Sequence, residues 1–503
     1  MSHPKQFSVL LCLTLLFLCG CSKDNALVEE SKGNTETTAE GVNVVFRLQS
    51  NQTSILTRGS ATAEDSNDNP TTGLPAEYQV NNATVYFFDS ATKLFTKSVK
   101  LKGLTPDKAS GWIYEAEPIL APQGHYDIFV TANTDREINK ETEDEFLANI
   151  DDLTYSQGEI TDITNGIVMS NRAVDNLNTE IKKSNKADEV KTIQIMLERV
   201  VARLDVAVNK DAFDLTDGVN KYATIKIKDF YIVNYPKHYY TYRHTAVLTS
   251  LEEPVWAMPG NFGRVADVNG YVIDPYFFKK KADAADFKNL DKYYANFYGD
   301  FNRENPNIWK ALNPANPTDP KFVTSYCLEN CMLAPSQKNG YSTGVMFRAT
   351  MEPYNNVYRL NSAGTDKELI TDPALYPEKL YYYDYKFFTY EALDWYVKST
   401  MPGASTVKYE APEFDKTDAG YQCYYRYWIR HLDNYKDNEM GVMEFAIVRN
   451  NYYRMLVTNV KDLGYGGQGT IEPNPDIPDE GEALLKVVLN VKPWVVRKID
   501  VEL

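Results

Sequence analysis

Short runs of alternating apolar and polar residues recur along most of this chain. In the first run, over residues 42–49, the apolar even positions are Val42, Val44, Phe46 and Leu48. Successive side chains of a β-strand point to opposite faces, so a period of two predicts a strand with one buried face. Similar runs, separated by turn residues, continue from about residue 78 to the end of the chain. The sequence therefore predicts a mostly β protein built as β-sandwiches.

The runs are numerous enough to form two β-sandwich domains. Predicted strands cover residues 83–88, 126–130, 193–206, 223–233, 239–248, 344–351 and 443–448, and predicted helices cover residues 143–153 and 389–398. A length of 503 residues also suits two or three domains. Because the run over residues 193–206 is long enough to bridge two domains, we place their boundary near Val200. We expect an N-terminal domain over residues 59–199 and a C-terminal domain over residues 200–463.

The start of the chain has the layout of a secretory signal. Lys5 precedes an apolar run over residues 9–18 that is too short to span a bilayer. The following Leu-Cys-Gly-Cys sequence looks like a bacterial lipobox, in which the thiol of Cys21 takes the lipid. We expect residues 1–21 to be a lipoprotein signal peptide that directs the precursor to the outer membrane surface. An ordinary secretory signal with an incidental cysteine is the alternative.

A pro-segment over residues 22–58 is predicted to follow the signal. It begins with a polar, acidic stretch that is typical of a flexible tether, and it contains the strand over residues 42–49. Beyond this strand, Arg58 and Gly59 lie in a polar segment where a protease could reach the bond between them. Such a cut would leave residues 59–503 and discard the lipid together with the strand.

The end of the chain repeats the arrangement of a strand on a tether. Residues 464–483 are dense in glycine and proline and predict a flexible linker. Two alternating runs follow within residues 484–503. Their apolar positions are Leu485, Val487, Leu489 and Val491 in the first run and Val495, Ile499, Val501 and Leu503 in the second.

The two tethered strands together predict polymerisation by donor-strand assembly. An alternating strand needs a sheet for both its apolar face and its backbone groups. Removal of the N-terminal plug strand would open a groove that the last strands of another molecule could fill. Because each subunit gives one surface and receives with a different one, the contact is heterologous and generates a filament.

Several blocks of sequence resemble one known family. They are residues 197–203, residues 447–453, the Leu463-Gly464 pair, the proline-rich linker and the run from Val487 to Leu503, together with the lipobox and Arg58. In these blocks the chain is similar to the major shaft subunit of the short-fimbria type of Bacteroidales fimbrillins, which form type V pili.

The resemblance implies a fold and an assembly route. It implies two tandem transthyretin-like β-sandwich domains, a removable N-terminal strand and a C-terminal donor-strand tail, with residues 485–491 and 495–503 as donors. An arginine-specific protease would mature the lipoprotein precursor. The partners would be identical subunits in a head-to-tail fibre and accessory tip and anchor subunits. The mature form would lie in an extracellular fimbria that supports adhesion or biofilm formation, with residues 270–340 unassigned and the receptor unknown.

Composition and motifs argue against other functions. A net charge of −16, from 53 basic and 69 acidic residues, would repel nucleic acid. Residues 464–469 satisfy the G-x-G-x-x-G pattern, but prolines follow where a dinucleotide site needs a helix. We expect Cys327 and Cys331 to be a buried thiol pair or a disulfide, since two ligands do not make a zinc site.

No catalytic constellation stands out either. Arg430, His431 and Asp433 invite a general-base interpretation, but no nucleophile accompanies them, and a surface hydrogen bond between His431 and Asp433 is the simpler explanation. Residues 433–439 lack the spacing of a calcium loop. We therefore expect no enzymatic activity, no metal and no cofactor. The alternatives to a shaft subunit are a fimbrial tip or anchor subunit and a surface glycan-binding lipoprotein.

Overall fold

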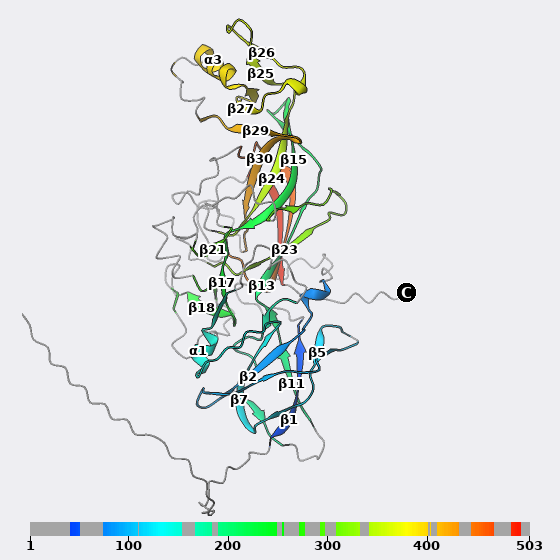
Figure 1. The fold of residues 1–503 in the computed structure, drawn as a ribbon, viewed down its shortest axis with the longest axis vertical. Coiled ribbons are helices and arrows are strands. Elements are labelled where there is room, and N and C mark those ends of the chain that lie inside the picture. The colour runs from blue at the N-terminus through cyan, green and yellow to red at the C-terminus, as the bar shows by residue number, and fades with distance from the viewer. Residues whose placement is uncertain are drawn as a thin grey trace, which may run out of the picture. The chain divides into compact units, whose positions relative to one another are not determined.

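The structure is a computed structural model that describes a defined set of residues. They are residues 41–50, 74–108, 110–152, 166–183, 190–248, 254–255, 271–276, 292–296, 308–331, 342–400, 403, 410–431, 444–466 and 484–493. Strands dominate these residues, which confirms the predicted mostly β fold (Figure 1). None of the helices in these ranges is long and apolar enough to cross a membrane.

The N-terminal sandwich consists of two facing sheets. In the first, the strand order is β11 (Lys191–Met196), β1 (Val42–Gln49), β5 (Ile113–Glu115) and β4 (Thr105–Pro106), and β6 (Ile119–Ala121) also pairs with β1. In the second, the order is β12 (Glu198–Arg199), β9 (Met169–Ser170), β7 (Gly124–Ala132), β2 (Ala83–Asp89) and β3 (Phe95–Lys100), with β10 (Thr179–Ile181) on β7. Phe46 of the first sheet meets Phe87 of the second, with ring centroids 6.1 Å apart.

Strand β2 is buried on both faces, and its outer face carries a small aromatic cluster. Phe88 packs against Phe146 of helix α1 (Glu143–Leu147) with ring centroids 4.9 Å apart. The hydroxyl of Thr142 caps this helix by accepting from the backbone N–H of Glu145. The predicted helix over residues 143–153 is therefore too long, because β8 (Ile150–Asp152) follows and pairs with β17 (His238–Tyr240).

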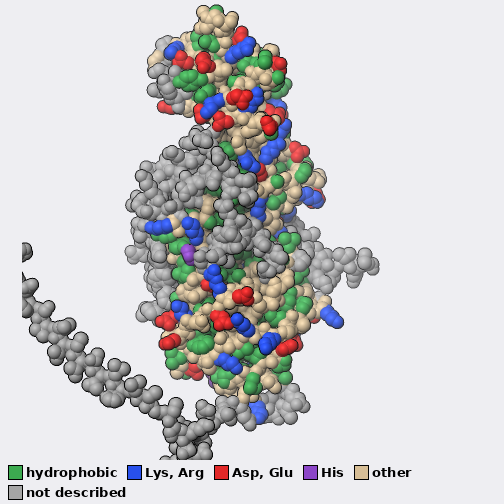
Figure 2. Space-filling model, viewed as in Figure 1, with side chains coloured by type: hydrophobic (Ala, Val, Ile, Leu, Met, Phe, Trp, Pro, Cys, Tyr) green, Lys and Arg blue, Asp and Glu red, His purple; other side chains and the backbone are tan. Residues whose placement is uncertain are grey.

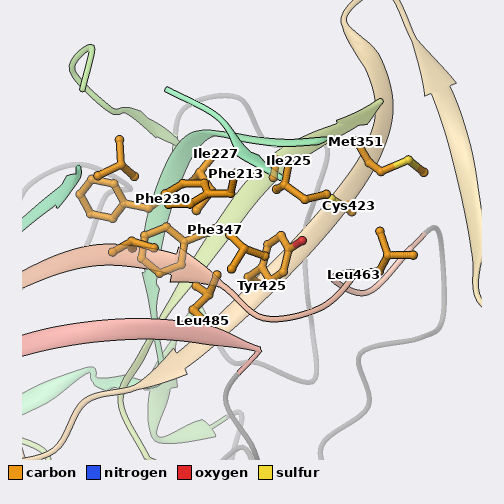
Figure 3. Packing of buried hydrophobic residues seen from close by; sticks show 14 of the residues in the cluster. Phe213, Ile225, Ile227, Phe230, Phe347, Met351, Cys423, Tyr425, Leu463 and Leu485 are labelled. Carbon is orange, nitrogen blue, oxygen red and sulfur yellow. The ribbon is translucent and has the colours of Figure 1, made fainter. Parts of the chain in front are cut away.

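The C-terminal sandwich packs a four-stranded sheet against a larger one. The smaller sheet has the order β23 (Val323–Leu328), β13 (Val201–Val208), β31 (Asn451–Val460) and β32 (Leu485–Pro493). The larger has the order β14 (Phe213–Thr216), β15 (Lys221–Val233), β24 (Gly344–Pro353), β30 (Gly420–Trp428), β29 (Glu413–Thr417), β27 (Lys379–Tyr383), β28 (Lys386–Phe388), β25 (Val357–Leu360) and β26 (Lys367–Leu369), with β22 (Lys310–Ala311) on β15. Figure 3 shows Leu485 among the core residues, in the same cluster as Phe347 and Tyr425 of the facing sheet.

The remaining elements are short. They are the 3-10 helices η1 (Pro75–Glu77) and η5 (Pro373–Leu375), helix α3 (Tyr390–Thr400) and the strands β16 (Tyr235–Pro236), β18 (His244–Leu248), β19 (Pro254–Val255), β20 (Tyr271–Ile273) and β21 (Tyr294–Ala295). Helix α3 confirms the helix predicted over residues 389–398. Both sandwiches belong to one compact unit that begins at Gly41.

Three of the predicted strands differ from the structure. The run over residues 193–206 is divided among β11, β12 and β13, which belong to three different sheets. The run over residues 239–248 is broken at Thr241, Tyr242 and Arg243, which separate β17 from β18. In the run over residues 443–448, the described residues contain only an isolated bridge at Ile447. These last residues are buried without being strand, a case that apolar patterning alone does not distinguish.

Candidate strand-exchange site

Strand β1, the predicted plug strand, lies inside the N-terminal sandwich. It pairs in parallel with β11 over Val44–Lys191 to Gln49–Met196, and antiparallel with β5 and β6 on its other side. Its apolar face is buried as the alternation predicts: Val44, Phe46 and Leu48 have no exposed surface, and Val42 is 6% exposed. A strand with neighbours on both sides and a buried face leaves a deep apolar groove when it is removed.

Strand β32, the first predicted donor strand, lies at an edge of the smaller C-terminal sheet. It runs antiparallel to β31, from the Asn451–Pro493 pair to the Val460–Leu485 pair. Leu485 is buried, and Val487 and Leu489 pack against the core as partly buried side chains. Since β31 is its one hydrogen-bonded neighbour among the described strands, β32 is tied to fewer backbone partners than β1.

The first residues of the predicted linker, residues 464–466, pack against the larger C-terminal sheet. The backbone groups of Tyr465 and Tyr424 exchange hydrogen bonds of 2.7 and 2.8 Å, which attach this segment to β30. Gly464 packs so closely against β30 that a Cβ there would lie 2.4 Å from the carbonyl oxygen of Tyr424. Glycine is therefore required at Gly464 for close approach and not for flexibility. Residues 467–483 lie outside the described residues.

Several other predicted site residues also lie outside the described residues. They are the lipidation residue Cys21, the cleavage pair Arg58 and Gly59, and the second donor run with Val495, Ile499, Val501 and Leu503. Val491 lies within β32 and pairs with Tyr453.

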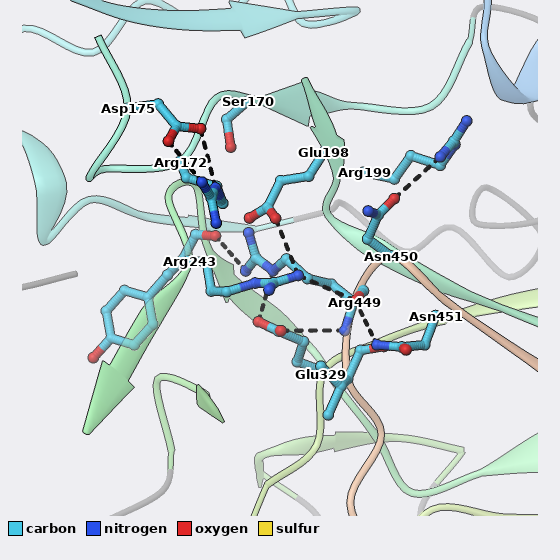
Figure 4. A network of polar contacts seen from close by, with 12 residues as sticks. Ser170, Arg172, Asp175, Glu198, Arg199, Arg243, Glu329, Arg449, Asn450 and Asn451 are labelled. Carbon is cyan, nitrogen blue, oxygen red and sulfur yellow. Dashed lines mark hydrogen bonds and ion pairs between the residues drawn. The ribbon is translucent and has the colours of Figure 1, made fainter. Parts of the chain in front are cut away.

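The junction of the two sandwiches contains paired charges that the sequence analysis did not predict (Figure 4). Arg449 donates from Nε to Glu329 at 2.7 Å, and Arg243 lies 3.0 Å from Glu198. These side chains are at most 6% exposed. Buried charges are stable only when they are paired and hydrogen-bonded, so these contacts fix the relative position of the segments that carry them.

A second buried network joins the start of the N-terminal domain to the C-terminal sheet. Glu77 accepts two hydrogen bonds from Nη1 of Arg203, at 2.8 and 2.9 Å, and one from the hydroxyl of Tyr326 at 2.7 Å. Asp205 binds the other side of the same guanidinium at 2.9 Å. The signal for this site is present in the sequence, because Arg203 and Asp205 interrupt an apolar run where unpaired charges are not tolerated.

Arg199 lies between the two networks and touches both sandwiches. Its guanidinium donates to the carbonyl oxygen of Glu77 at 2.6 Å, to the carbonyl oxygen of Ser50 at 3.0 Å and to Oδ1 of Asn450 at 3.1 Å. The side chain is fully buried, and burial lowers the pKa of Arg199 to about 10. At neutral pH it therefore remains a charged donor in a site without water contact.

Of the two states expected for Cys327 and Cys331, the structure has the buried thiols and not the disulfide. Cys327 lies on β23, and the chain stays extended as far as the bridge at Asn330. Residues four apart along an extended chain are separated by about 13 Å, whereas a disulfide needs Cα atoms within about 7 Å. Burial raises the pKa of the Cys327 thiol, which keeps it protonated and inert.

The expectation of a surface hydrogen bond at His431 is wrong for the histidine itself. His431 is 5% exposed, and its Nδ1 lies 2.7 Å from the hydroxyl of Tyr453. Arg430 lies 3.8 Å from Glu444, and Asp433 is outside the described residues.

No cluster of three or more His, Cys, Asp and Glu side chains suited to a metal ion occurs in the described part of the chain. Figure 2 shows acidic and basic side chains interspersed on the described surface in view.

Buried His244 predicts a loss of stability in acid. Burial lowers the pKa of His244 from 6.5 to about 4, and its Nε2 donates to the carbonyl oxygen of Leu147 at 2.8 Å. Between pH 6.5 and about pH 4 the unfolded chain binds more protons than the folded chain. The free energy of unfolding therefore decreases as the pH is lowered, by up to about 3 kcal/mol. Urea midpoints at pH 7 and pH 4.5 measure the loss. It should shrink in His244→Gln and persist in His125→Gln, which alters an exposed histidine.

Two family profiles match this chain. Residues 36–268 match the fimbrillin-A associated anchor proteins Mfa1 and Mfa2, and residues 419–500 match the C-terminal region of fimbrillin, the major fimbrial subunit protein type IV. No curated protein matches the chain. A fimbrilin, FimA, of Porphyromonas gingivalis is similar over 92% of this chain and 99% of its own, at 14% identity and a TM-score of 0.41. The tip fimbrial protein Mfa3 of the same organism, with a C-terminal truncation, is similar over 90% and 99%, at 11% identity and a TM-score of 0.38.

The two family matches define a class of protein, that of fimbrial proteins at the cell surface. Within this class the chain belongs to the fimbrillin family. The first matched region contains β1, and the second contains β31 and β32. Both ends of the predicted strand exchange thus lie inside the regions that mark the family.

Proposed function

We propose that this fimbrillin is a shaft subunit that polymerises by protease-triggered donor-strand exchange. A cut after Arg58 removes β1 from the N-terminal sandwich, and the C-terminal strands of a second subunit fill the groove that β1 leaves. The lipid on Cys21 is discarded with the removed segment, and the mature subunit, residues 59–503, joins an extracellular fibre. The role is structural and not enzymatic.

The observation that carries the proposal is the position of β1. Four apolar side chains at alternate positions of β1, Val42 to Leu48, are buried. Its removal exposes an apolar groove and unpaired backbone groups of β11 and β5. An incoming strand regains burial worth on the order of 10 kcal/mol together with the ladder hydrogen bonds.

The donor strand matches the plug strand in period and in number of apolar residues. Leu485, Val487, Leu489 and Val491 repeat the spacing of Val42, Val44, Phe46 and Leu48. The edge position of β32 favours its release, because leaving its own sheet breaks one ladder of hydrogen bonds. Since donor and acceptor surfaces differ, the exchange propagates into a filament.

Cleavage of the purified full-length chain with a trypsin-like, arginine-specific protease tests the proposal. We expect a cut after Arg58 followed by ladders that resist warm SDS, because strand exchange dissociates very slowly. The chain with Arg58→Ala should remain uncut at this bond and monomeric. Clean cleavage after Arg58 without polymers would contradict the proposal.

An anchor subunit is the second candidate, because residues 36–268 match a family of anchor proteins. An anchor ends a fibre and does not extend it. Deletion of residues 484–503 distinguishes the two roles in cells. It abolishes fibres if the chain is a shaft subunit, whereas fibres that form and detach from the cell would favour the anchor.

A further inference from the structure

The end of β1 is connected to the start of β31 through a single buried side chain. Ser50 directly follows β1, and Asn450 directly precedes β31. Arg199 donates to the carbonyl oxygen of Ser50 at 3.0 Å and to Oδ1 of Asn450 at 3.1 Å. All three residues are fully buried. The plug strand and the strand that holds β32 therefore share one charged hydrogen-bond donor, although they belong to different sandwiches.

Ser50 is a firm anchor on the N-terminal side. Its N–H donates to the carbonyl oxygen of Trp112 at 3.1 Å, and its hydroxyl donates to the carbonyl oxygen of Tyr78 at 2.7 Å. The adjacent carbonyl oxygen of Gln49 accepts from the N–H of Leu197 at 2.8 Å. The carbonyl group that faces Arg199 is thus fixed as long as β1 occupies its groove.

Asn450 is a weaker anchor on the C-terminal side. Its backbone is left-handed, with φ of 56°, and its N–H donates to the carbonyl oxygen of Val201 at 2.8 Å. Its side-chain Nδ2 is buried without a hydrogen-bond partner among the described residues. The contact from Arg199 to Oδ1 is therefore the bond that holds this side chain. Asn451, the next residue, pairs with Pro493 at the end of β32.

We infer that Arg199 is a positioning residue that makes release of β32 depend on the loss of β1. When β1 leaves, the buried guanidinium loses one of its acceptors, the carbonyl oxygen of Ser50, and the loss of a hydrogen bond to a buried charge is costly. Arg199 then shifts away from Asn450, and the Asn450 side chain loses its hydrogen bond. The start of β31 and the paired end of β32 then open more often. The uncut precursor thus keeps its own donor strand in place. This inference rests on the proposed removal of β1.

The test measures amide hydrogen exchange of β32 in the full-length chain, with β1 weakened by Phe46→Ala. We expect Phe46→Ala to speed exchange in β32 by roughly tenfold, since local opening sets the exchange rate. Asn450→Gly removes the amide group and keeps the left-handed backbone. In that background β32 already exchanges faster, and Phe46→Ala adds less than about twofold.

Asn355→Gly is the matched control, because Asn355 is an exposed asparagine with φ of 53°. It should leave the tenfold response intact. An unchanged β32 in Phe46→Ala, or an equal response in the Asn450→Gly and Asn355→Gly backgrounds, would overturn the inference. If the amides of β2 and β7 also exchange faster in the Phe46→Ala chain, the experiment is repeated with Val44→Ala in its place. The same outcomes then support or overturn the inference. The ladder assay on the unaltered chain reports separately on strand exchange, so the two proposals fail independently.

Discussion

Replacing Glu77 by alanine should destabilise the protein by about 3–5 kcal/mol, because it removes one of the two carboxylates that pair with the buried guanidinium of Arg203. The Glu77 side chain has no exposed surface, and it accepts from Arg203, from the Tyr326 hydroxyl and from the N–H of Leu74. All three donors would lose an acceptor together. The midpoint of urea unfolding, followed by circular dichroism, measures the effect.

A matched control is available on the surface. Lys226 and Glu352 form an ion pair at 2.6 Å with side chains 37% and 49% exposed. Glu352→Ala should cost no more than about 1 kcal/mol, because water screens and replaces such a pair. Equal costs for Glu77→Ala and Glu352→Ala would show that the buried network does not hold the two sandwiches together. Glu77 lies beyond Arg58, so this network remains in the proposed mature subunit.

Replacing Phe46 by alanine should cost about 3–5 kcal/mol in the uncut chain. The Phe46 ring is completely buried and contacts Phe87 edge to face. The smaller side chain leaves a cavity between the two sheets, and the rigid sheets collapse into it only in part. Thermal unfolding of the full-length chain should therefore begin at a lower temperature.

Phe95→Ala provides the comparison for this second prediction. Phe95 lies on β3 and is 39% exposed, so its loss removes less buried area. A Phe46→Ala chain as stable as Phe95→Ala would mean that β1 contributes little to the N-terminal core. The groove could then not bind a replacement strand tightly, and the proposed function would lose its main support.

Alternation of apolar residues was sufficient to predict the face that β1 buries. The buried side chains of β1 at Val44, Phe46 and Leu48 alternate with side chains on the opposite face. A shift of the pairing register by one residue would exchange the two faces. The same rule holds for β32, where Leu485, Val487 and Leu489 pack toward the core. It fails for the run over residues 443–448, whose described residues, 444–448, are buried outside any strand. Period alone does not distinguish a strand from a buried loop.

Neither the partners of β1 nor the contacts of Arg199 could be predicted in this way. The parallel neighbour of β1 is β11, more than 140 residues away in the sequence. Arg199 joins Ser50 to Asn450 across separations of 149 and 251 residues. Sequence patterns report on residues a few positions apart, whereas these contacts depend on how whole sheets pack.

The β class, the strands β1 and β32 and the apolar faces that they bury could be predicted from the sequence, because they follow from a local period and from turn residues. The packed structure was needed to show that β1 lies between two neighbours inside its sheet and that β32 lies at the edge of another. It also decided that Cys327 and Cys331 remain thiols and that buried charges join the two sandwiches. Pairing, burial and desolvation depend on neighbours that are distant in the chain, and local patterns carry no information about them.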